Sequence, residues 1–234
     1  MGESAEKQKR FLQYAASPYA GIDGGDEQAE YWFVGMEWSA REDFAESFEK
    51  WQKCAESPYS KNVDITKGSW AFENRLNDIY KCLSHKVTGE RIFADGSNAF
   101  KLNLFPLSFK SQEEKDNWQS DAAAQQTGFT SFAEYQRAVI PARRELFAAL
   151  LKKNNKPKTI FCFGTGYLEY FAAAFGLSKK AFIEQPNRLA RNYRFYAAFP
   201  DNPLIKKIIL CPFYYADSDI KHIVNCSESA ENRL

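Results

Sequence analysis

Four short apolar runs, each followed by a stretch with helical periodicity, constrain the fold of this chain more than any other feature. The runs are residues 31–34, 100–105, 158–163 and 207–211. Each is rich in β-favouring residues and is closed by glycine or proline, which is the pattern of a buried strand. Buried strands that alternate with helices are typical of a parallel sheet covered on both faces. We therefore expect an α/β fold with three α/β/α layers and a central four-stranded parallel sheet.

The stretches between these runs have the spacing of helices. Apolar side chains recur every three or four residues in 41–56 and 70–84, which predicts two amphipathic helices. Further helical segments are expected over residues 4–16, 111–155, 167–175 and 219–224.

The strongest helical run covers residues 139–151. We expect it to bury its leucines and to expose the charged side chains of Arg143, Arg144 and Glu145. The Gly/Asp-rich segment 21–25, which precedes the first apolar run, is expected to be a turn.

Composition narrows the class of protein. The chain has 234 residues, of which 44% are hydrophobic and 26% charged, as in ordinary folded proteins. No run is long enough to cross a bilayer, and the charged N-terminal segment does not resemble a secretion signal, so we expect no membrane contact. There is no internal repeat or low-complexity linker, which favours one domain over 1–234 with its motif-bearing core at about 30–225.

Cysteine and histidine usage bears on compartment and cofactors. The five cysteines are an odd number without a CxxC pair, so we expect reduced thiols and a cytoplasmic protein. Only two histidines are present, which leaves few ligands for zinc, and no acidic metal-binding run occurs. No metal and no cofactor are therefore expected.

The carboxyl ends of the expected strands are the places where chemistry gathers in such sheets. Glu37 follows the first strand, where its carboxylate is suited to activate a water molecule or to cap the next helix. Asn103 interrupts an apolar strand, so its amide must bond either a ligand such as a base edge or the backbone. Cys211 is interpreted as a buried apolar residue, because a nucleophile would need a nearby base such as His222.

Basic residues collect in the last third of the chain. Residues 151–234 hold 13 Lys and Arg against 7 Asp and Glu, and several of the basic residues are interleaved with aromatic ones. This pattern suits a surface that follows a phosphate backbone, although a solvated helix face with core rings would look the same. The candidate DNA-backbone contacts are Lys179, Lys180, Arg188 and Arg191.

Taken in order along the chain, five segments resemble the motifs of the uracil-DNA glycosylase superfamily. Residues 34–38 (VGMEW) are similar to its first motif, and residues 68–76 (GSWAFENRL) to the segment that carries a base-stacking aromatic. Residues 103–107 (NLFPL) resemble the strand whose Asn reads a pyrimidine edge, and 160–164 (IFCFG) the third strand. Residues 211–215 (CPFYY) fall where the family has H-P-S and a DNA-intercalating loop.

The resemblance implies roles for individual residues. Glu37 would place the hydrolytic water, Asn103 would bond the base edge, and Trp70 or Phe72 would stack on the ring. Tyr214 or Tyr215 would supply a hydroxyl or a wedge. The remaining substrate-binding residues implied are Gly35, Met36, Trp38 and Phe213.

Two departures from the family pattern leave activity open. The family proline after the acidic or amide residue is replaced by Trp38-Ser39, and the histidine that stabilises the departing base is missing. We expect a protein that binds single- or double-stranded DNA and hydrolyses the N-glycosidic bond of a damaged, flipped or unpaired base. The alternative is a catalytically silent member of the fold that binds nucleic acid, a nucleotide or a protein. A third hypothesis is an unrelated α/β enzyme with a site for a small molecule.

Overall fold

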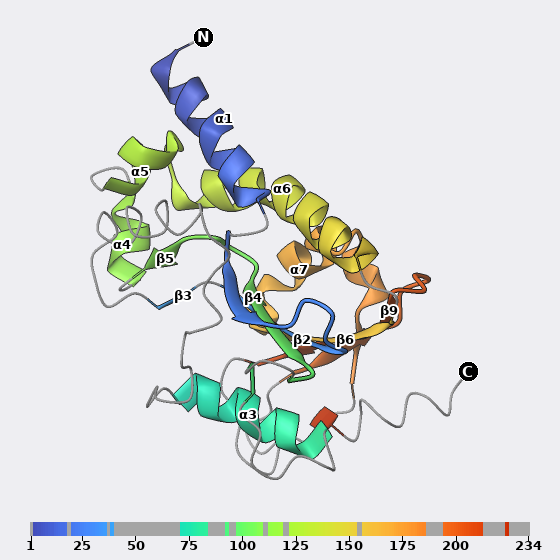
Figure 1. Ribbon diagram of the computed structural model, residues 1–234. Helices are drawn as coiled ribbons and strands as arrows, with labels where there is room; N and C mark the ends of the chain where they lie inside the picture. Colours follow the sequence, from blue (N-terminus) through green and yellow to red (C-terminus); the bar gives the residue numbers. More distant parts are fainter. Residues whose placement is uncertain are drawn as a thin grey trace.

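A mixed α/β architecture with helices on both faces of one large sheet is seen in the computed structural model (Figure 1). The structure describes residues 2–17, 20–36, 38–39, 71–83, 92–93, 97–109, 112–118, 122–153, 156–185, 194–212 and 223–224. None of the helices in these ranges is long and apolar enough to cross a membrane.

The centre of the sheet is formed by the four strands expected from the apolar runs. They are β2 (Tyr31–Gly35), β4 (Ala99–Asn103), β6 (Lys158–Phe163) and β9 (Ile205–Cys211). They lie in the order β4-β2-β6-β9 and all three neighbouring pairs are parallel. The α/β class and the parallel centre are thus confirmed.

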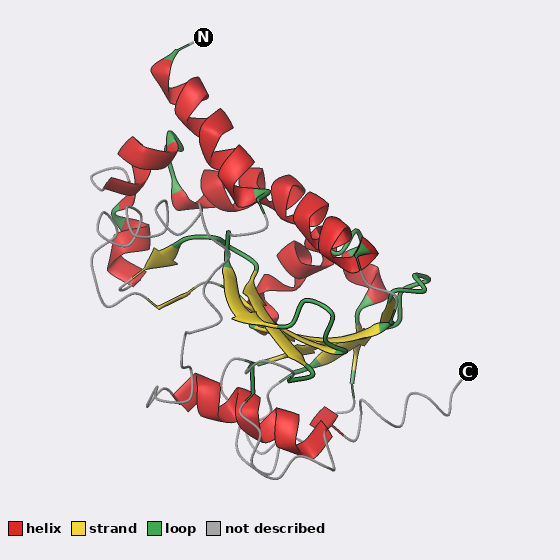
Figure 2. Ribbon diagram, viewed as in Figure 1, coloured by secondary structure: helices red, strands yellow, loops and turns green. Residues whose placement is uncertain are grey.

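The sheet is larger than four strands, because short antiparallel strands extend both of its edges (Figure 2). Strand β1 (Ile22–Gly25) pairs with β4, while β8 (Tyr196–Ala198) and β7 (Ile183–Glu184) continue the sheet beyond β9. Within the described residues the sheet therefore has seven strands, and a separate parallel pair joins β3 (Trp38–Ser39) to β5 (Ser108–Phe109). The expected four parallel strands are thus the centre of a larger sheet, and the expectation of four strands in all was wrong.

The segment expected to be a turn is in fact strand β1. Two of its four residues are glycines with positive φ, so the strand is irregular and shifts its register against β4 between Ile22 and Gly24. Such a strand has no period-2 apolar pattern, and it is held by pairing with β4, which sequence alone does not reveal.

One face of the sheet is covered by α1 (Glu3–Ala15), α6 (Phe132–Lys152) and α7 (Leu168–Ala174), which share a buried apolar core with Trp32, Val34, Leu102 and Cys162. Figure 1 shows α1 and α6 side by side above α7. Helices α4 (Gln112–Asp116) and α5 (Ala122–Thr127) lie towards the N-terminal end of α6. Two 3₁₀ turns, Thr165–Tyr167 and Lys179–Ala181, flank α7.

The opposite face is covered by α3 (Ala71–Leu83). Leu76, Ile79 and Tyr80 of this helix pack against the sheet residues Phe33 and Phe161, whose rings stack with centroids 5.5 Å apart. The expected helices at 4–16, 70–84 and 167–175 are confirmed to within one residue at each end, whereas the segment 111–155 contains three helices. The helix expected at 41–56 lies outside the described residues.

Candidate functional site

The carboxyl ends of the four parallel strands meet at one edge of the sheet. Gly35 at the end of β2 is paired with Asn103 at the end of β4. The chain stays paired just beyond these strands, because the N–H of Phe105 donates to the carbonyl of Met36 at 2.7 Å. At the next two strands, the N–H of Gly164 donates to the carbonyl of Cys211 at 2.8 Å. Gly35, Met36, Asn103 and Cys211 therefore lie along the same edge.

Met36 joins the first and third of these strand ends. A Cβ added at Gly164 would lie 2.5 Å from the sulfur of Met36. Gly164 also has a φ of 116°, a backbone conformation that residues other than glycine rarely adopt. The glycine that ends the third apolar run is thus required by both conformation and contact with Met36.

Asn103 is the centre of a buried polar cluster that also contains Asp23 and Lys101. The exposed fractions of Asn103, Asp23 and Lys101 are 2%, 4% and 6%. Asn103 Nδ2 donates to Asp23 Oδ1 at 3.1 Å, and Lys101 Nζ lies 2.5 Å from Asp23 Oδ2. Lys101 and Asn103 alternate with their neighbours in β4 in the same phase as Ala99, so the cluster lies on the face of the sheet that α3 covers.

Burial dominates the electrostatics of this cluster. It raises the pKa of Asp23 above the ordinary value, while the Lys101 ammonium and the Asn103 amide act in the opposite direction. The structure brings Lys101 Nζ to 2.5 Å from Asp23 Oδ2, within ion-pair distance. Removing one partner of a buried ion pair lowers the stability of a protein strongly, because it leaves the other charge buried.

The carbonyl oxygen of the Asn103 side chain points towards Gly35. A Cβ added at Gly35 would overlap this Oδ1 atom, so the close approach requires glycine. Among the residues that the structure describes, Asn103 Oδ1 accepts no hydrogen bond. The amide is therefore anchored through its nitrogen, and its oxygen is the atom that is left to bond a ligand.

The backbone of Asn103 is held from the other face of the sheet by Arg143. Its Nη2 donates to the carbonyl of Asn103 at 2.6 Å, and its Nη1 donates to the carbonyls of Ala15 and Ala20 at 2.9 and 2.7 Å. Burial lowers the pKa of Arg143 to about 10. The guanidinium lies over the Phe147 ring, 5.2 Å from its centroid.

The expectation that Arg143 is exposed was wrong, since its exposed fraction is 0%. Its long side chain crosses the core because three buried carbonyl oxygens need donors there, and a planar guanidinium supplies several at once. Arg144 and Glu145, the next two residues, are exposed as expected.

Several candidate residues lie outside the part of the chain that the structure describes. They are Glu37, Trp70, Phe213, Tyr214, Tyr215, Arg188 and Arg191. For Trp38 and Phe72 the backbone is described, in β3 and α3, but the side chain is not.

Cys211 ends β9 as a fully buried residue, and burial raises the pKa of its thiol. Cys162 on the neighbouring strand is also fully buried, and its thiol pKa is raised for the same reason. A neutral, buried thiol is a small apolar residue and not a nucleophile, as the sequence indicated. Cys82, Cys162 and Cys211 are free cysteines.

The candidate DNA-backbone residue Lys179 already has a partner. Its Nζ donates to Glu169 at 2.8 Å, and this carboxylate raises the pKa of the lysine. Both side chains are exposed, so the pair is weak and a phosphate would compete with Glu169 for Lys179. The nearby Lys180 is exposed, whereas the aromatic residues Phe182 and Phe195 are buried and cannot stack on bases.

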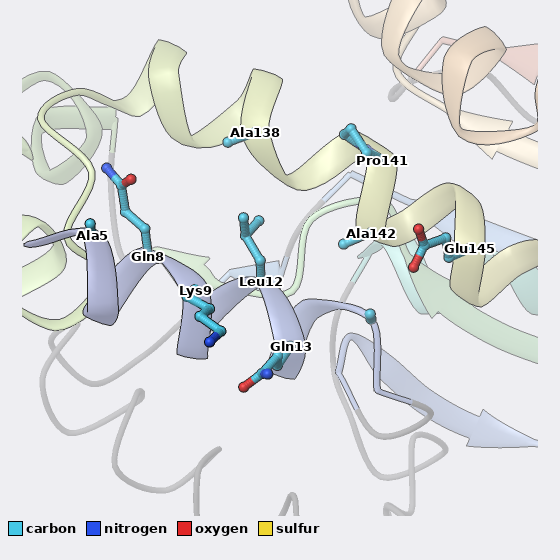
Figure 3. Close-up of a pocket in the computed structure, with 10 residues that line it drawn as sticks. Ala5, Gln8, Lys9, Leu12, Gln13, Ala138, Pro141, Ala142 and Glu145 are labelled. Atoms are coloured by element: carbon cyan, nitrogen blue, oxygen red, sulfur yellow. The ribbon is translucent and has the colours of Figure 1, made fainter. Parts of the chain in front are cut away.

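A hollow of about 530 Å³ runs between α1 and α6 (Figure 3). It is lined by Ala5, Gln8, Lys9, Leu12, Gln13, Ala16, Ala138, Pro141, Ala142 and Glu145. It lies on the α1 and α6 side of the sheet, away from the Asn103 side chain, and its lining contains no nucleophile paired with a base. Across the described ranges, no three His, Cys, Asp or Glu side chains are grouped so that they could hold a metal ion.

The sequence analysis did not predict that Asp23 and Lys101 lie beside Asn103, or that the side chain of Arg143 is buried. Isolated charges in a turn-like segment and in a strand look solvated, and only the pairing of β1 with β4 brings Asp23 to Lys101 and Asn103. The alternation of β4 offered one signal, because Lys101 and Asn103 occupy the same face of a strand that is otherwise apolar.

No family model, no curated protein and no solved structure matches this chain.

Proposed function

We propose that this protein binds a nucleobase at the carboxyl edge of its parallel strands and hydrolyses the N-glycosidic bond of that base in DNA. The observation that carries the proposal is the placement of the Asn103 amide beside Gly35, with its nitrogen anchored and its oxygen free of hydrogen bonds from the described residues. A base taken out of a helix is read through hydrogen bonds to its Watson–Crick edge, which is what a fixed amide offers.

The neighbouring strand ends support the same site. Gly35, which has no Cβ, lets the amide oxygen of Asn103 approach the end of β2 closely, and Met36 follows there. Glu37 is the next residue in the sequence, and the resemblance to uracil-DNA glycosylases assigns it the water that attacks the sugar. The side chain of Trp70 or Phe72 would stack on the ring of the base. Tyr214 or Tyr215 would supply a hydroxyl group or insert into the DNA as a wedge.

A specific observation favours a second candidate, a silent protein that binds nucleic acid without cleaving it. The strand end where the resembling family has a histidine carries Cys211, whose buried thiol has a raised pKa and cannot stabilise an anionic leaving base. Catalysis would then depend on donors other than the residue at 211.

The test is a cleavage assay on end-labelled single- and double-stranded oligonucleotides that contain uracil, hypoxanthine, xanthine or a thymine mismatch. We expect alkali-labile breaks at one of these bases, and a rate at least about 100-fold lower in Glu37→Gln, because a positioned general base contributes about 10²–10⁴-fold. Glu145→Gln, an exposed carboxylate on α6, is the matched control and should leave the rate unchanged.

The remaining outcomes separate the two candidates. Binding without breaks would favour the silent protein. Neither binding nor breaks would contradict both candidates. Where binding is seen, raising salt from about 50 to 200 mM should weaken it, since phosphate contacts release counterions.

A further inference from the structure

The groove between α1 and α6 has an apolar floor and charged ends. Its lining includes Leu12, Ala138 and Ala142, which are half-buried and pack against the core beneath them. Lys9 and Glu145 are the two charged residues of the lining, and both are exposed. In the part of the chain that the structure describes, neither of them forms an ion pair. The groove therefore presents one cation and one anion to a partner.

These two charges lie at opposite ends of the groove, because α1 and α6 run in the same direction. Gln8 in the first half of α1 donates to Glu134 at the start of α6, with the two atoms 3.4 Å apart. At the end of α1, the carbonyl of Ala15 accepts from Arg143, 2.9 Å away. A helix rises 1.5 Å per residue, so the lysine and the carboxylate of the groove are about 10–15 Å apart along its length.

The outer face of α1 has a shape that fills such a groove. Ala5, Lys9 and Gln13 are exposed, and their spacing of four residues places them in one row along the helix. Rows of this kind pack into the grooves of a facing helix pair. Because the same helix forms one wall of the groove, α1 of each of two copies can lie in the groove of the other around a two-fold axis.

A two-fold axis also makes the charges complementary. It turns α1 of the second copy antiparallel to the first, so Lys9 of each copy reaches the end of the groove that carries Glu145 of the other. Two equivalent ion pairs form in this way. The antiparallel arrangement sets the positive end of each helix dipole beside the negative end of its neighbour, which α1 and α6 of one chain do not achieve.

We propose that the α1–α6 groove is a self-association surface, through which two copies of this chain form an antiparallel, two-fold symmetric dimer. The groove lies on the α1 and α6 side of the sheet, whereas the Asn103 side chain lies on the face that α3 covers. The proposal is therefore independent of base binding. Since the contact uses one helical row of each copy, the interface is small and the dimer is expected to be reversible.

Sedimentation equilibrium of the full chain between about 1 and 200 μM tests the proposal. We expect the mean mass to rise with concentration from 26.9 kDa towards twice that value. Reversing one charge, in Lys9→Glu or Glu145→Lys, makes both contacts repulsive and should weaken the dimer by about tenfold or more. The double variant Lys9→Glu/Glu145→Lys again places opposite charges together, so its dissociation constant should return to within about threefold of the wild-type value.

The chain offers a matched control and a variant that tests the shape of the groove. Lys152→Glu reverses an exposed lysine of α6 that does not line the groove, and it should leave the dissociation constant unchanged. Ala142→Trp places a large ring on the groove floor without changing charge, and it should also weaken the dimer by about tenfold or more. Lys9 and Glu145 are exposed, so the charge-reversed variants should keep the circular dichroism spectrum of the wild type.

Three outcomes would overturn the proposal. The first is a wild-type chain that stays at 26.9 kDa over the whole concentration range. The second is a dimer that neither single charge reversal weakens, since it would form through another surface. The third is a double variant that dimerises as weakly as the single ones, because it would exclude the antiparallel pairing. None of these outcomes bears on base binding, which the cleavage assay tests separately.

Discussion

Replacing Arg143 by methionine is expected to lower the free energy of unfolding by about 3–5 kcal/mol, among the largest effects of a single substitution. Methionine fills similar space but donates no hydrogen bond, so the carbonyls of Ala15, Ala20 and Asn103 lose their partner. Each buried acceptor left without a donor costs about 1–3 kcal/mol, and the desolvation cost of the removed guanidinium offsets part of the sum.

Urea unfolding followed by circular dichroism measures this effect. Arg144→Met, one residue along the same helix and exposed, is the matched control and should change the free energy of unfolding by less than about 0.5 kcal/mol. Arg143→Lys should fall between the two, because an ammonium cannot reproduce the planar fork. A loss below about 1 kcal/mol in Arg143→Met would show that water or other donors replace the guanidinium.

Removing Asp23 alone is expected to lower the free energy of unfolding by about 3–5 kcal/mol, because it takes away the carboxylate that Lys101 Nζ contacts inside the protein. Asp23→Ala, Lys101→Met and the double variant form a double-mutant cycle. The double variant should be more stable than the sum of the single changes predicts, with a coupling of about 2–3 kcal/mol.

The same cycle at Glu27 and Lys153 is the control, since both side chains are substantially exposed. Its coupling should stay below about 1 kcal/mol. Additive effects at Asp23 and Lys101 would mean that the two charges do not stabilise each other, and the amide of Asn103 would then lose its fixed anchor.

The centre of the fold could be predicted from the sequence because hydrophobic runs dictate it. Strands β2, β4, β6 and β9 are buried on both faces, so their apolar runs are nearly continuous and end at glycine or proline. Strands β1, β7 and β8 have two to four residues each and lie at the sheet edges. Their pairing comes from tertiary contacts and leaves no periodic pattern in the sequence.

The site could be predicted only where a residue contradicts its local pattern. Asn103 is a polar residue in an apolar strand, and this contrast pointed to it, as did the resemblance of residues 103–107 to a family motif. Asp23 lies in a Gly/Asp-rich segment, and Arg143 begins a run of three charged residues in a helix. The side chains of such segments are normally exposed to solvent. Their burial depends on a partner, Asn103, that is 80 residues from Asp23 and 40 residues from Arg143 in the chain.

The central claim is that a base binds at the edge of the sheet where β2 and β4 end. It is tested most directly by amide NMR of the protein titrated with a short single-stranded DNA that carries one uncleavable uracil nucleotide. We predict the largest shift changes at Gly35 and Asn103 and none at Gln13 and Ala142, which line the α1–α6 groove. Unchanged resonances at Gly35 and Asn103 at saturating DNA would contradict the claim.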